Sequence, residues 1–267
     1  MERTYRGAHG AAGPLLFVEG VRGAALGEEV RIQPPDGPRV RGQVVDAGER
    51  LTVVQVLEST VGLAPARSTL TLTGRVAEAV VGRELLGRAL DGLGRPIDGL
   101  PAPVGEASVP IWGAPMNPVC RRAPADPIET GVSAIDGLNT LVRGQKLPIF
   151  SGGGLPAMEL AARIVRDARV PGAGDGDEGF AVVFCAIGVT ERETGIFLED
   201  HERSASRDRT LLYLNRARDP TIERLLVPRM ALTAAEHLAF EAGLHVLVVL
   251  ADVTHYCEAL REIASAR

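Results

Sequence analysis

The sequence lacks the features that mark several large classes of protein. Only 4% of its 267 residues are aromatic, and its three cysteines (Cys120, Cys185 and Cys257) form no CxxC pair. An odd number of widely spaced cysteines is typical of free thiols in a reducing compartment rather than of a disulfide framework. The first residues contain no apolar signal segment. The longest apolar run, near residues 246–251, is far too short to span a membrane. The sequence therefore predicts a cytoplasmic protein.

The overall composition is that of an ordinary soluble protein. Hydrophobic residues make up 45% of the chain and charged residues 24%, and the length is sufficient for two domains. The net charge of −5 argues against nucleic acid as a partner, because nucleic-acid phosphates are bound by basic surfaces. Since aromatic residues are scarce, we expect the core to be filled by Val, Leu, Ile and Ala.

The first part of the chain has the pattern of an all-β domain. Short apolar runs at 14–18, 29–32, 40–45, 51–57 and 69–72 are separated by Gly, Pro and Asp at fairly regular spacing. This pattern is typical of a small barrel or sandwich, and closing a barrel removes exposed strand edges. The sequence predicts a small β-barrel over residues 1–73. Residues 74–130, with much Pro and Gly and Trp112 as the large anchor, are predicted as an extended connecting segment.

The remainder, residues 131–267, alternates strands with helices. We predict strands at 145–150, 180–187, 210–214 and 245–250, and helices at 157–169, 191–203, 228–242 and 254–266. The strands are continuously apolar, which is typical of a parallel sheet covered on both faces. The predicted fold class is therefore α/β: a β-barrel followed by a mostly parallel, P-loop-type nucleotide-binding domain that is partial in this chain.

A glycine loop follows the predicted strand 145–150 and precedes the predicted helix at 157. This arrangement is the frame of a Walker A site, in which backbone amides and a helix N-terminus hold phosphates. A working loop would continue with Lys and Ser or Thr, which contact the outer phosphates and magnesium. Here Leu155 offers no charge, and Pro156 offers neither an amide donor nor a hydroxyl. We interpret the loop as a degenerate nucleotide site made of Ser151, Gly152, Gly153, Gly154, Leu155 and Pro156; the alternative is a tight turn that caps a helix.

Other candidate residues carry weaker signals. Asp252 follows an apolar strand as a Walker B carboxylate does, although an acidic residue in this place is also a common helix cap. Glu191 and Glu193 follow the strand 180–187, but they are equally well explained as first-turn residues of a helix. The histidines show no spacing typical of metal ligands. The sequence therefore predicts no catalytic residue and no metal site.

Several blocks of sequence together resemble the B subunits (beta chains) of V-type and A-type rotary ATPases, also called ATP synthases. The similarity covers nearly the whole chain, and its longest blocks are highly specific. They lie at 13–19, 86–88, 94–99, 130–136, 140–151, 219–224, 228–233 and 256–263.

This resemblance implies a non-catalytic, regulatory subunit that alternates with a catalytic A subunit in a six-membered head, alongside central and peripheral stalk subunits. It implies proton transport by the complex, with membrane contact only through other subunits. ATP or ADP would lie at subunit interfaces, bound mainly by the catalytic partner, which would also hold Mg²⁺. By the same resemblance, Leu155 and Pro156 replace the Walker lysine and threonine of the catalytic subunit. Val189 lies near the position of its water-activating glutamate.

The chain also departs from the family pattern. Family members continue beyond the position of Arg267 into a C-terminal helical domain, so we expect this chain to be truncated at its C-terminus. Residues 194–197 and 203–209 differ from the usual pattern. Two alternative functions follow: a catalytic ATPase of the same superfamily, such as a secretion-system ATPase or the A subunit, or a degenerate fragment without a role in assembly.

Overall fold

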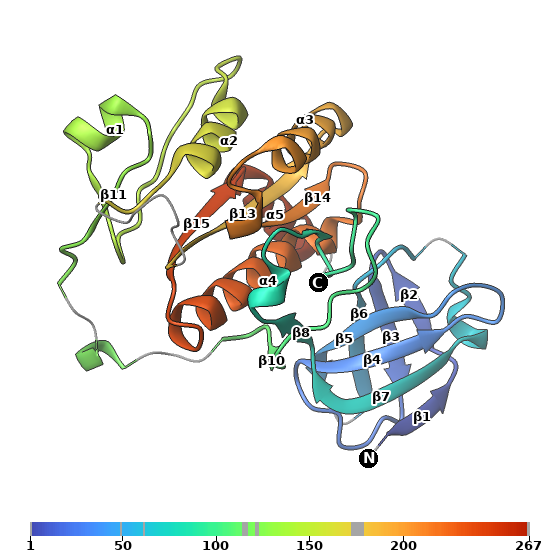
Figure 1. Cartoon of the computed structure of the whole chain (residues 1–267). Helices are drawn as coiled ribbons and strands as arrows, with labels where there is room; N and C mark the ends of the chain where they lie inside the picture. The colour runs from blue at the N-terminus through green and yellow to red at the C-terminus, as the bar shows by residue number, and fades with distance from the viewer. Residues whose placement is uncertain are drawn as a thin grey trace. The chain divides into compact units, whose positions relative to one another are not determined.

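A computed structural model describes residues 2–48, 50–60, 62–113, 117–120, 123–171 and 179–265. The chain divides into two compact units. The first contains residues 1–78, 219–226 and 254–267, and the second contains residues 79–218 and 227–253. Figure 1 shows the chain coloured from its N-terminus to its C-terminus.

The first unit contains a seven-stranded antiparallel sheet. Its order is β1-β7-β4-β5-β6-β3-β2. The strands are β1 (Arg3–Arg6), β2 (Gly10–Ala12), β3 (Leu15–Glu19), β4 (Glu28–Gln33), β5 (Val40–Ala47), β6 (Leu51–Val56) and β7 (Thr69–Val76). The five predicted strands are all present. β1 and β2 were not predicted, because neither is an apolar run of the usual length.

The two edge strands of this sheet belong to one stretch of chain. β1 pairs with β7 and β2 pairs with β3, and only three residues separate β1 from β2. Within this gap the Gly7 N–H donates to Ser68 O at 2.9 Å, and the His9 N–H donates to Phe17 O at 2.7 Å. The N-terminal segment thus joins both sides of the curved sheet around an apolar interior of Val, Leu and Ile, and the predicted barrel is confirmed.

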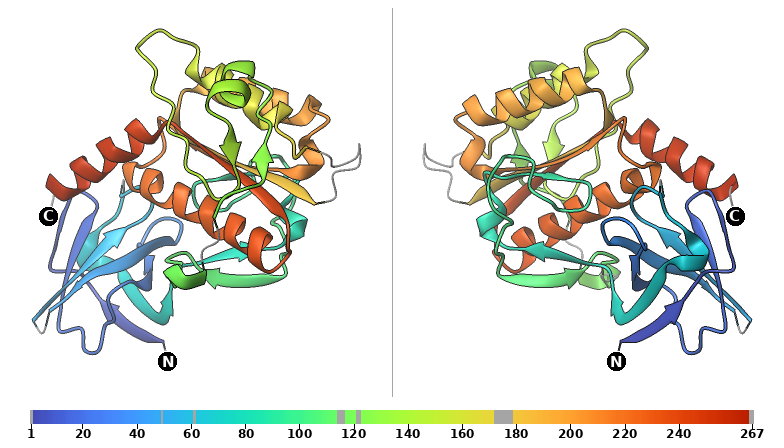
Figure 2. Two further views of the ribbon diagram at one scale, coloured as in Figure 1. Left: turned by 90° about the vertical axis from the view of Figure 1, so that its left-hand side faces the viewer. Right: turned by 90° about the vertical axis from the view of Figure 1, so that its right-hand side faces the viewer.

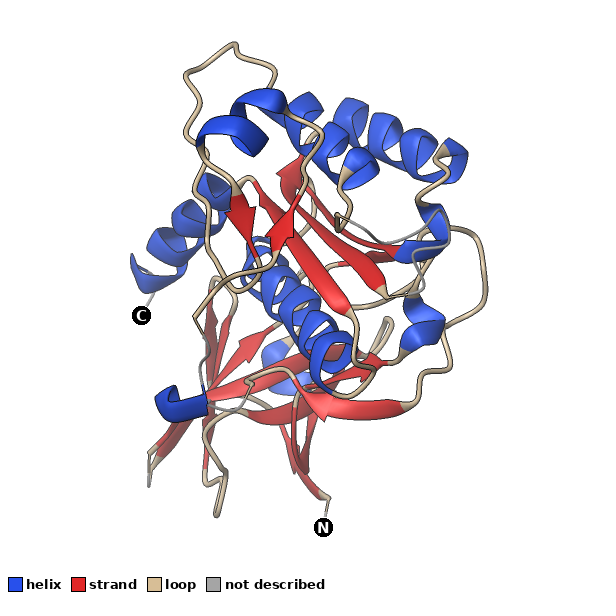
Figure 3. Cartoon of the chain, turned by 60° about the vertical axis from the view of Figure 1, so that its left-hand side comes forward, coloured by secondary structure: helices blue, strands red, loops and turns tan. Residues whose placement is uncertain are grey.

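The second unit is built on a four-stranded parallel sheet of order β15-β13-β14-β9. Its strands are β9 (Ala89–Asp91), β13 (Phe180–Val189), β14 (Thr210–Arg216) and β15 (His245–Ala251). The helices that follow the sheet strands or the glycine loop are α2 (Ala157–Asp167), α3 (Glu191–Arg203), α4 (Thr221–Phe240) and α5 (Val253–Ser265). Of these, residues 221–226 of α4 and residues 254–265 of α5 belong to the first unit. Figures 2 and 3 show α2 and α3 on one face of the sheet and the α4 helix on the other. The predicted parallel α/β fold is confirmed.

The core under α2 and α3 is continuous and apolar. Every residue of β13 is buried, as the unbroken apolar run predicted. Val182, Phe184 and Ala186 belong to the cluster that includes residues of α2 and α3. The Phe184 and Phe197 rings meet edge to face with centroids 5.1 Å apart, a favourable aromatic geometry. Because side chains alternate along a strand, Cys185 and its neighbour Tyr213 of β14 lie on the opposite face.

The strand predicted at 145–150 is wrong. These residues adopt no strand, and Ile149 and Phe150 are 51% and 92% exposed. Pro148 has no N–H to donate to a strand ladder, and β15 forms the edge of the sheet in the described structure. The nearest pairing is a short antiparallel ladder between β11 (Pro127–Ile128) and β12 (Leu141–Val142), which flanks α1 (Ser133–Leu138).

Two further elements differ from the sequence predictions. The stretch predicted as a connection contributes β9, which pairs with β14, and a small ladder of β8 (Glu78–Val81) with β10 (Ala107–Pro110). Helix α4 begins seven residues before the predicted position 228, with Pro228 inside it. A proline within a helix removes one backbone hydrogen bond, so the sequence pattern favoured it as a helix start.

Candidate functional site

The glycine loop (residues 151–156) lies at the carboxyl edge of the parallel sheet. This placement follows from topology, because α2 leads back to the amino end of β13 and so begins at the opposite edge. All six loop residues are exposed, and Leu155 is 63% exposed. Of the three glycines, only Gly154 has a positive φ, +83°. The predicted site residues therefore form a solvent-facing turn.

The backbone of the loop offers few donors in a fixed arrangement. The Leu155 N–H donates to Gly152 O at 3.3 Å, and the Ala157 N–H donates to Leu155 O at 2.8 Å. The N–H groups of Gly152, Gly153 and Gly154 meet no protein acceptor within the described ranges. These three amides and the Ser151 hydroxyl are groups of the loop that could donate hydrogen bonds to a phosphate.

The start of α2 adds little to this capacity. Its N-cap is Pro156, whose side chain makes no capping hydrogen bond, and Glu159 places a negative charge in the first turn. A carboxylate at a helix N-terminus is stabilised by the helix dipole, but it opposes an incoming anion. The only lysine of the sequence, Lys146, is exposed five residues before the loop. The loop itself, residues 151–156, therefore contains no cationic side chain.

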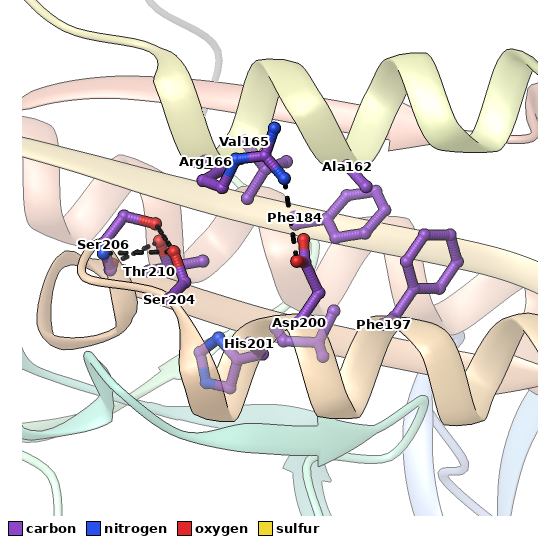
Figure 4. Close-up of a pocket in the computed structure, with 11 residues that line it drawn as sticks. Ala162, Val165, Arg166, Phe184, Phe197, Asp200, His201, Ser204, Ser206 and Thr210 are labelled. Carbon is purple, nitrogen blue, oxygen red and sulfur yellow. Dashed lines mark hydrogen bonds and ion pairs between the residues drawn. The ribbon is translucent and has the colours of Figure 1, made fainter.

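Asp252, the predicted Walker B-like residue, follows β15 directly and is exposed. It lies at the same edge of the sheet as the glycine loop, as parallel strands require. Neither Asp252 nor any loop residue lines the cavity shown in Figure 4. The structure thus places the predicted site residues at one edge without enclosing them in that pocket.

The backbone at the junction between β13 and α3 is held by side-chain hydrogen bonds that the glycine loop does not have. The ladder between β13 and β14 shifts register between Ala186 and Val189, and Gly188 has a φ of +66°. The Gly188 N–H donates to Asn215 Oδ1 at 3.1 Å, and Asn215 is fully buried. The Asn215 Nδ2 group has no partner in the part of the chain that the structure describes. Sequence reasoning missed this residue, because its partner lies 27 positions away.

A capping box continues this junction into α3. Thr190 Oγ1 accepts a hydrogen bond from the Glu193 N–H, and the Glu193 carboxylate accepts one from the Thr190 N–H at 2.8 Å. The pattern Thr-x-x-Glu predicts this arrangement. Glu191 pairs with Arg218 at 2.9 Å. The glutamates thus act as helix-start residues, the structural alternative considered for them.

A small cavity lies between α2, β13 and α3 (Figure 4). Its volume of about 20 Å³ has room for about one water molecule. On its polar side, Ser204 Oγ lies 2.8 Å from Ser206 Oγ, and Arg166 lies 3.7 Å from Asp200. Burial lowers the pKa of His201, whose Nε2 lies 3.1 Å from Gly87 O. The cavity is too small for a nucleotide.

The block 86–99 that carries part of the family resemblance is built around one ion pair. Arg88 Nε lies 2.6 Å from Asp98 Oδ2, and both side chains are largely buried. Burial alone would raise the pKa of Asp98, but the hydrogen bond from Arg88 and the N–H groups of Leu100 and Ala89 lower it to about 2. This pair fixes β9 against the turn that follows it.

Among the residues that the structure describes, no cluster of three or more His, Cys, Asp or Glu side chains is arranged to hold a metal ion. None of the described helices has the length and apolar character needed to cross a bilayer.

Comparison with known proteins matches both parts of the chain to one family. The ATP synthase alpha/beta family matches through its beta-barrel domain over residues 9–74 and its nucleotide-binding domain over residues 131–267. The chain is 62% identical to the V-type ATP synthase beta chain of Anaeromyxobacter sp. (strain Fw109-5), covering 99% of this chain and 57% of that protein. It is 53% identical to the V-type ATP synthase beta chain of Thermus thermophilus, covering 100% of this chain and 57% of that protein. The chain thus spans little more than half the length of these relatives.

Proposed function

Because the chain belongs to the ATP synthase alpha/beta family, we propose that it acts as a non-catalytic, regulatory subunit of a proton-translocating V-type rotary ATPase. The observation that carries this proposal is which residues end the glycine loop. Leu155 and Pro156 stand where a catalytic loop needs an ammonium group and a hydroxyl. The high identity to V-type ATP synthase beta chains supports the same assignment.

The role in catalysis would then be indirect. The loop 151–156 would contact ATP or ADP at a subunit interface through the amides of Gly152, Gly153 and Gly154, while the catalytic partner supplies the lysine, the hydroxyl and Mg²⁺. The exposure of all six loop residues supports this, because an interface site must be open in the isolated chain. Asp252 would line the same edge.

The proposed partners are a catalytic A subunit, alternating with this chain in a hexameric head, and the central and peripheral stalk subunits. The head would lie in the cytoplasm and touch the membrane only through the rest of the complex. Within the chain, we place the domain boundaries near residues 73 and 130. The matches at 9–74 and 131–267 support these positions.

The catalytic alternative, a secretion-system ATPase or an A subunit, is disfavoured by the same two loop residues and by the identity to beta chains. The remaining alternative, a fragment without an assembly role, makes a different prediction about binding to a catalytic subunit. Assembly, rather than hydrolysis, separates it from the proposed function.

The test combines hydrolysis with assembly. The purified chain alone should release no phosphate from MgATP above background, and mixing with a catalytic A subunit from a related V-type ATPase should give a complex of defined mass by light scattering. Hydrolysis by the isolated chain at a rate typical of ATPases would overturn the non-catalytic assignment. A lack of complex formation by a chain shown to be folded by circular dichroism would favour the fragment.

A further inference from the structure

A segment of the second unit crosses the C-terminal part of α4 and is attached to it twice. This segment, residues 105–113, is called the strap here; it contains β10, which pairs with β8. Figure 1 shows β10 beside α4. Neither the glycine loop nor any other proposed nucleotide-contacting residue belongs to the strap.

The first attachment joins a histidine and a carboxylate. His237 Nε2 of α4 lies 3.1 Å from Glu106 Oε2, and the His237 side chain is only 10% exposed. Glu106 also accepts a hydrogen bond from the Arg83 N–H at 3.4 Å. The two side chains carry opposite charges only when His237 is protonated, so the strength of this contact depends on that proton.

The second attachment places a guanidinium on an aromatic ring. The Arg229 Cζ atom lies 4.1 Å from the centre of the Trp112 ring, which is a cation–π distance. Arg229 precedes His237 by eight residues, or about two helical turns. Trp112 is 45% exposed and is the only tryptophan of the chain. Its fluorescence therefore reports on the strap alone.

Several titratable or charged side chains belong to the elements around the contact of His237 with Glu106. On the strap side these are Arg83, Glu84 and Glu106; on α4 or directly after it they are Arg229, Glu236 and Glu241. Cys185 and Tyr213 lie on the strand face opposite α2 and α3. Burial raises the pKa of both Cys185 and Tyr213. Both therefore stay neutral between pH 5 and 8, and neither competes with Glu106.

We propose that the strap is a proton-sensitive clamp on α4, tightened when His237 is protonated and loosened when it is neutral. Glu106 supplies the fixed charge, because the hydrogen bond from His237 lowers the pKa of Glu106 below its ordinary value. A lowered carboxylate pKa gives stabilisation that is present above the unfolded-state value and is lost as the pH falls through the folded-state value. The clamp is therefore tightest where His237 is protonated and Glu106 is ionised, and it weakens again in strong acid.

The experiment measures quenching of Trp112 fluorescence by acrylamide between about pH 5 and 8.5, the range in which imidazoles titrate, with circular dichroism at each pH to confirm folding. As the strap loosens, the quenching constant of the unmodified chain should rise about twofold across this range. Glu106→Gln keeps the size of the side chain and removes its charge, and it should flatten this profile. His201→Gln is the matched control, because His201 lies on α3 and contacts Gly87.

His237→Gln should flatten the profile as Glu106→Gln does. Should this buried position not tolerate glutamine, the partly exposed Glu106 variant decides the question by itself. An unmodified chain without pH dependence, or a Glu106→Gln profile equal to that of the unmodified chain, overturns the proposal. The proposal does not depend on the ATPase assignment, since neither nucleotide nor partner enters the measurement.

Discussion

Two connections in the second unit enter helices on the same face of the parallel sheet, and they differ in how fully their backbone groups are buried and hydrogen-bonded. The junction from β13 to α3 follows a fully buried strand and ends in a capping box. The glycine loop before α2 follows no strand, is exposed at every residue, and enters its helix at Pro156 without a side-chain cap. Both contain a glycine with positive φ, Gly188 and Gly154.

The difference lies in which backbone groups have partners. At the ordered junction, the Gly188 N–H is bound by Asn215 and the Thr190 N–H by Glu193. In the glycine loop, the three glycine amides have no protein acceptor in the described parts of the chain. A glycine sequence therefore permits a tight turn, but side chains elsewhere decide whether that turn has one fixed geometry. The glycine loop has neither such side-chain support for its glycine amides nor a charged side chain of its own.

The largest expected effect concerns Asp98, whose ion pair with Arg88 fixes β9, the strand that pairs with β14. Asp98→Asn should lower the free energy of unfolding by about 3 kcal/mol near pH 7, because Arg88 then remains buried without its counter-charge. In the unmodified chain, the pKa of Asp98 is lowered to about 2 in the folded state, which corresponds to about 2 kcal/mol of stabilisation above about pH 4. This stabilisation is lost as the pH falls toward about 2. Urea denaturation at about pH 7 and about pH 3 checks both values. Equal stability of the variant and the unmodified chain near neutral pH would show that the pair contributes nothing.

Asn215→Ala breaks the ordered junction directly. It leaves the Gly188 N–H buried without an acceptor, which should cost about 2 kcal/mol of unfolding free energy. Asn139→Ala is a suitable control, since Asn139 is exposed at the end of α1 and should change stability by less than about 0.5 kcal/mol. If both alanine variants unfold at the same urea concentration, Asn215 does not fix the register shift.

Substitutions at the N-caps of α3 and α2 should have smaller effects on stability, and the two effects should have opposite signs. Thr190→Ala should destabilise the chain by about 1 kcal/mol, because the Glu193 N–H loses its cap. Pro156→Ser should leave stability unchanged or raise it by up to about 1 kcal/mol, since serine can cap the start of α2. Thermal unfolding followed by circular dichroism compares the two. A loss of stability in Pro156→Ser as large as that in Thr190→Ala would mean that Pro156 already fixes its helix.

The smallest effects are expected inside the glycine loop. Gly154→Ala should cost about 1 kcal/mol through its positive φ alone, because no described atom lies within 4 Å of the position that an added methyl group would take. Gly153→Ala, without a positive φ and equally open, should be near neutral. Urea midpoints of the two variants make the comparison. A large loss for Gly153→Ala would reveal a constraint on the loop that its exposed geometry does not show.

The sequence was sufficient to predict elements with strong local signals. Helix α3 begins and ends at the predicted residues, and β13 and β15 lie where the long apolar runs placed them. The strand predicted at 145–150, of which only residues 147–150 are apolar, was wrong, because a strand also needs a neighbour with which to form hydrogen bonds. The three-residue strand β9 is too short to produce a pattern.

The features of the site could likewise be predicted where they depended on residue type, but not where they depended on contacts between distant residues. The absence of a cation and a hydroxyl at Leu155 and Pro156 could be read directly, since it depends only on residue type. The contact of Asn215 with Gly188, and that of His201 with Gly87, join residues 27 and 114 positions apart. One sequence contains no local sign of either pairing, so only the folded chain reveals them.

The most direct test of the central claim, that this glycine loop cannot hold a nucleotide by itself, is calorimetric titration of the isolated chain with MgATP. We expect no saturable binding tighter than a dissociation constant of about 1 mM, both in the unmodified chain and in Lys146→Ala. Micromolar binding to the unmodified chain that disappears in Lys146→Ala would contradict the account, because the only lysine of the chain would then replace the one missing from the loop.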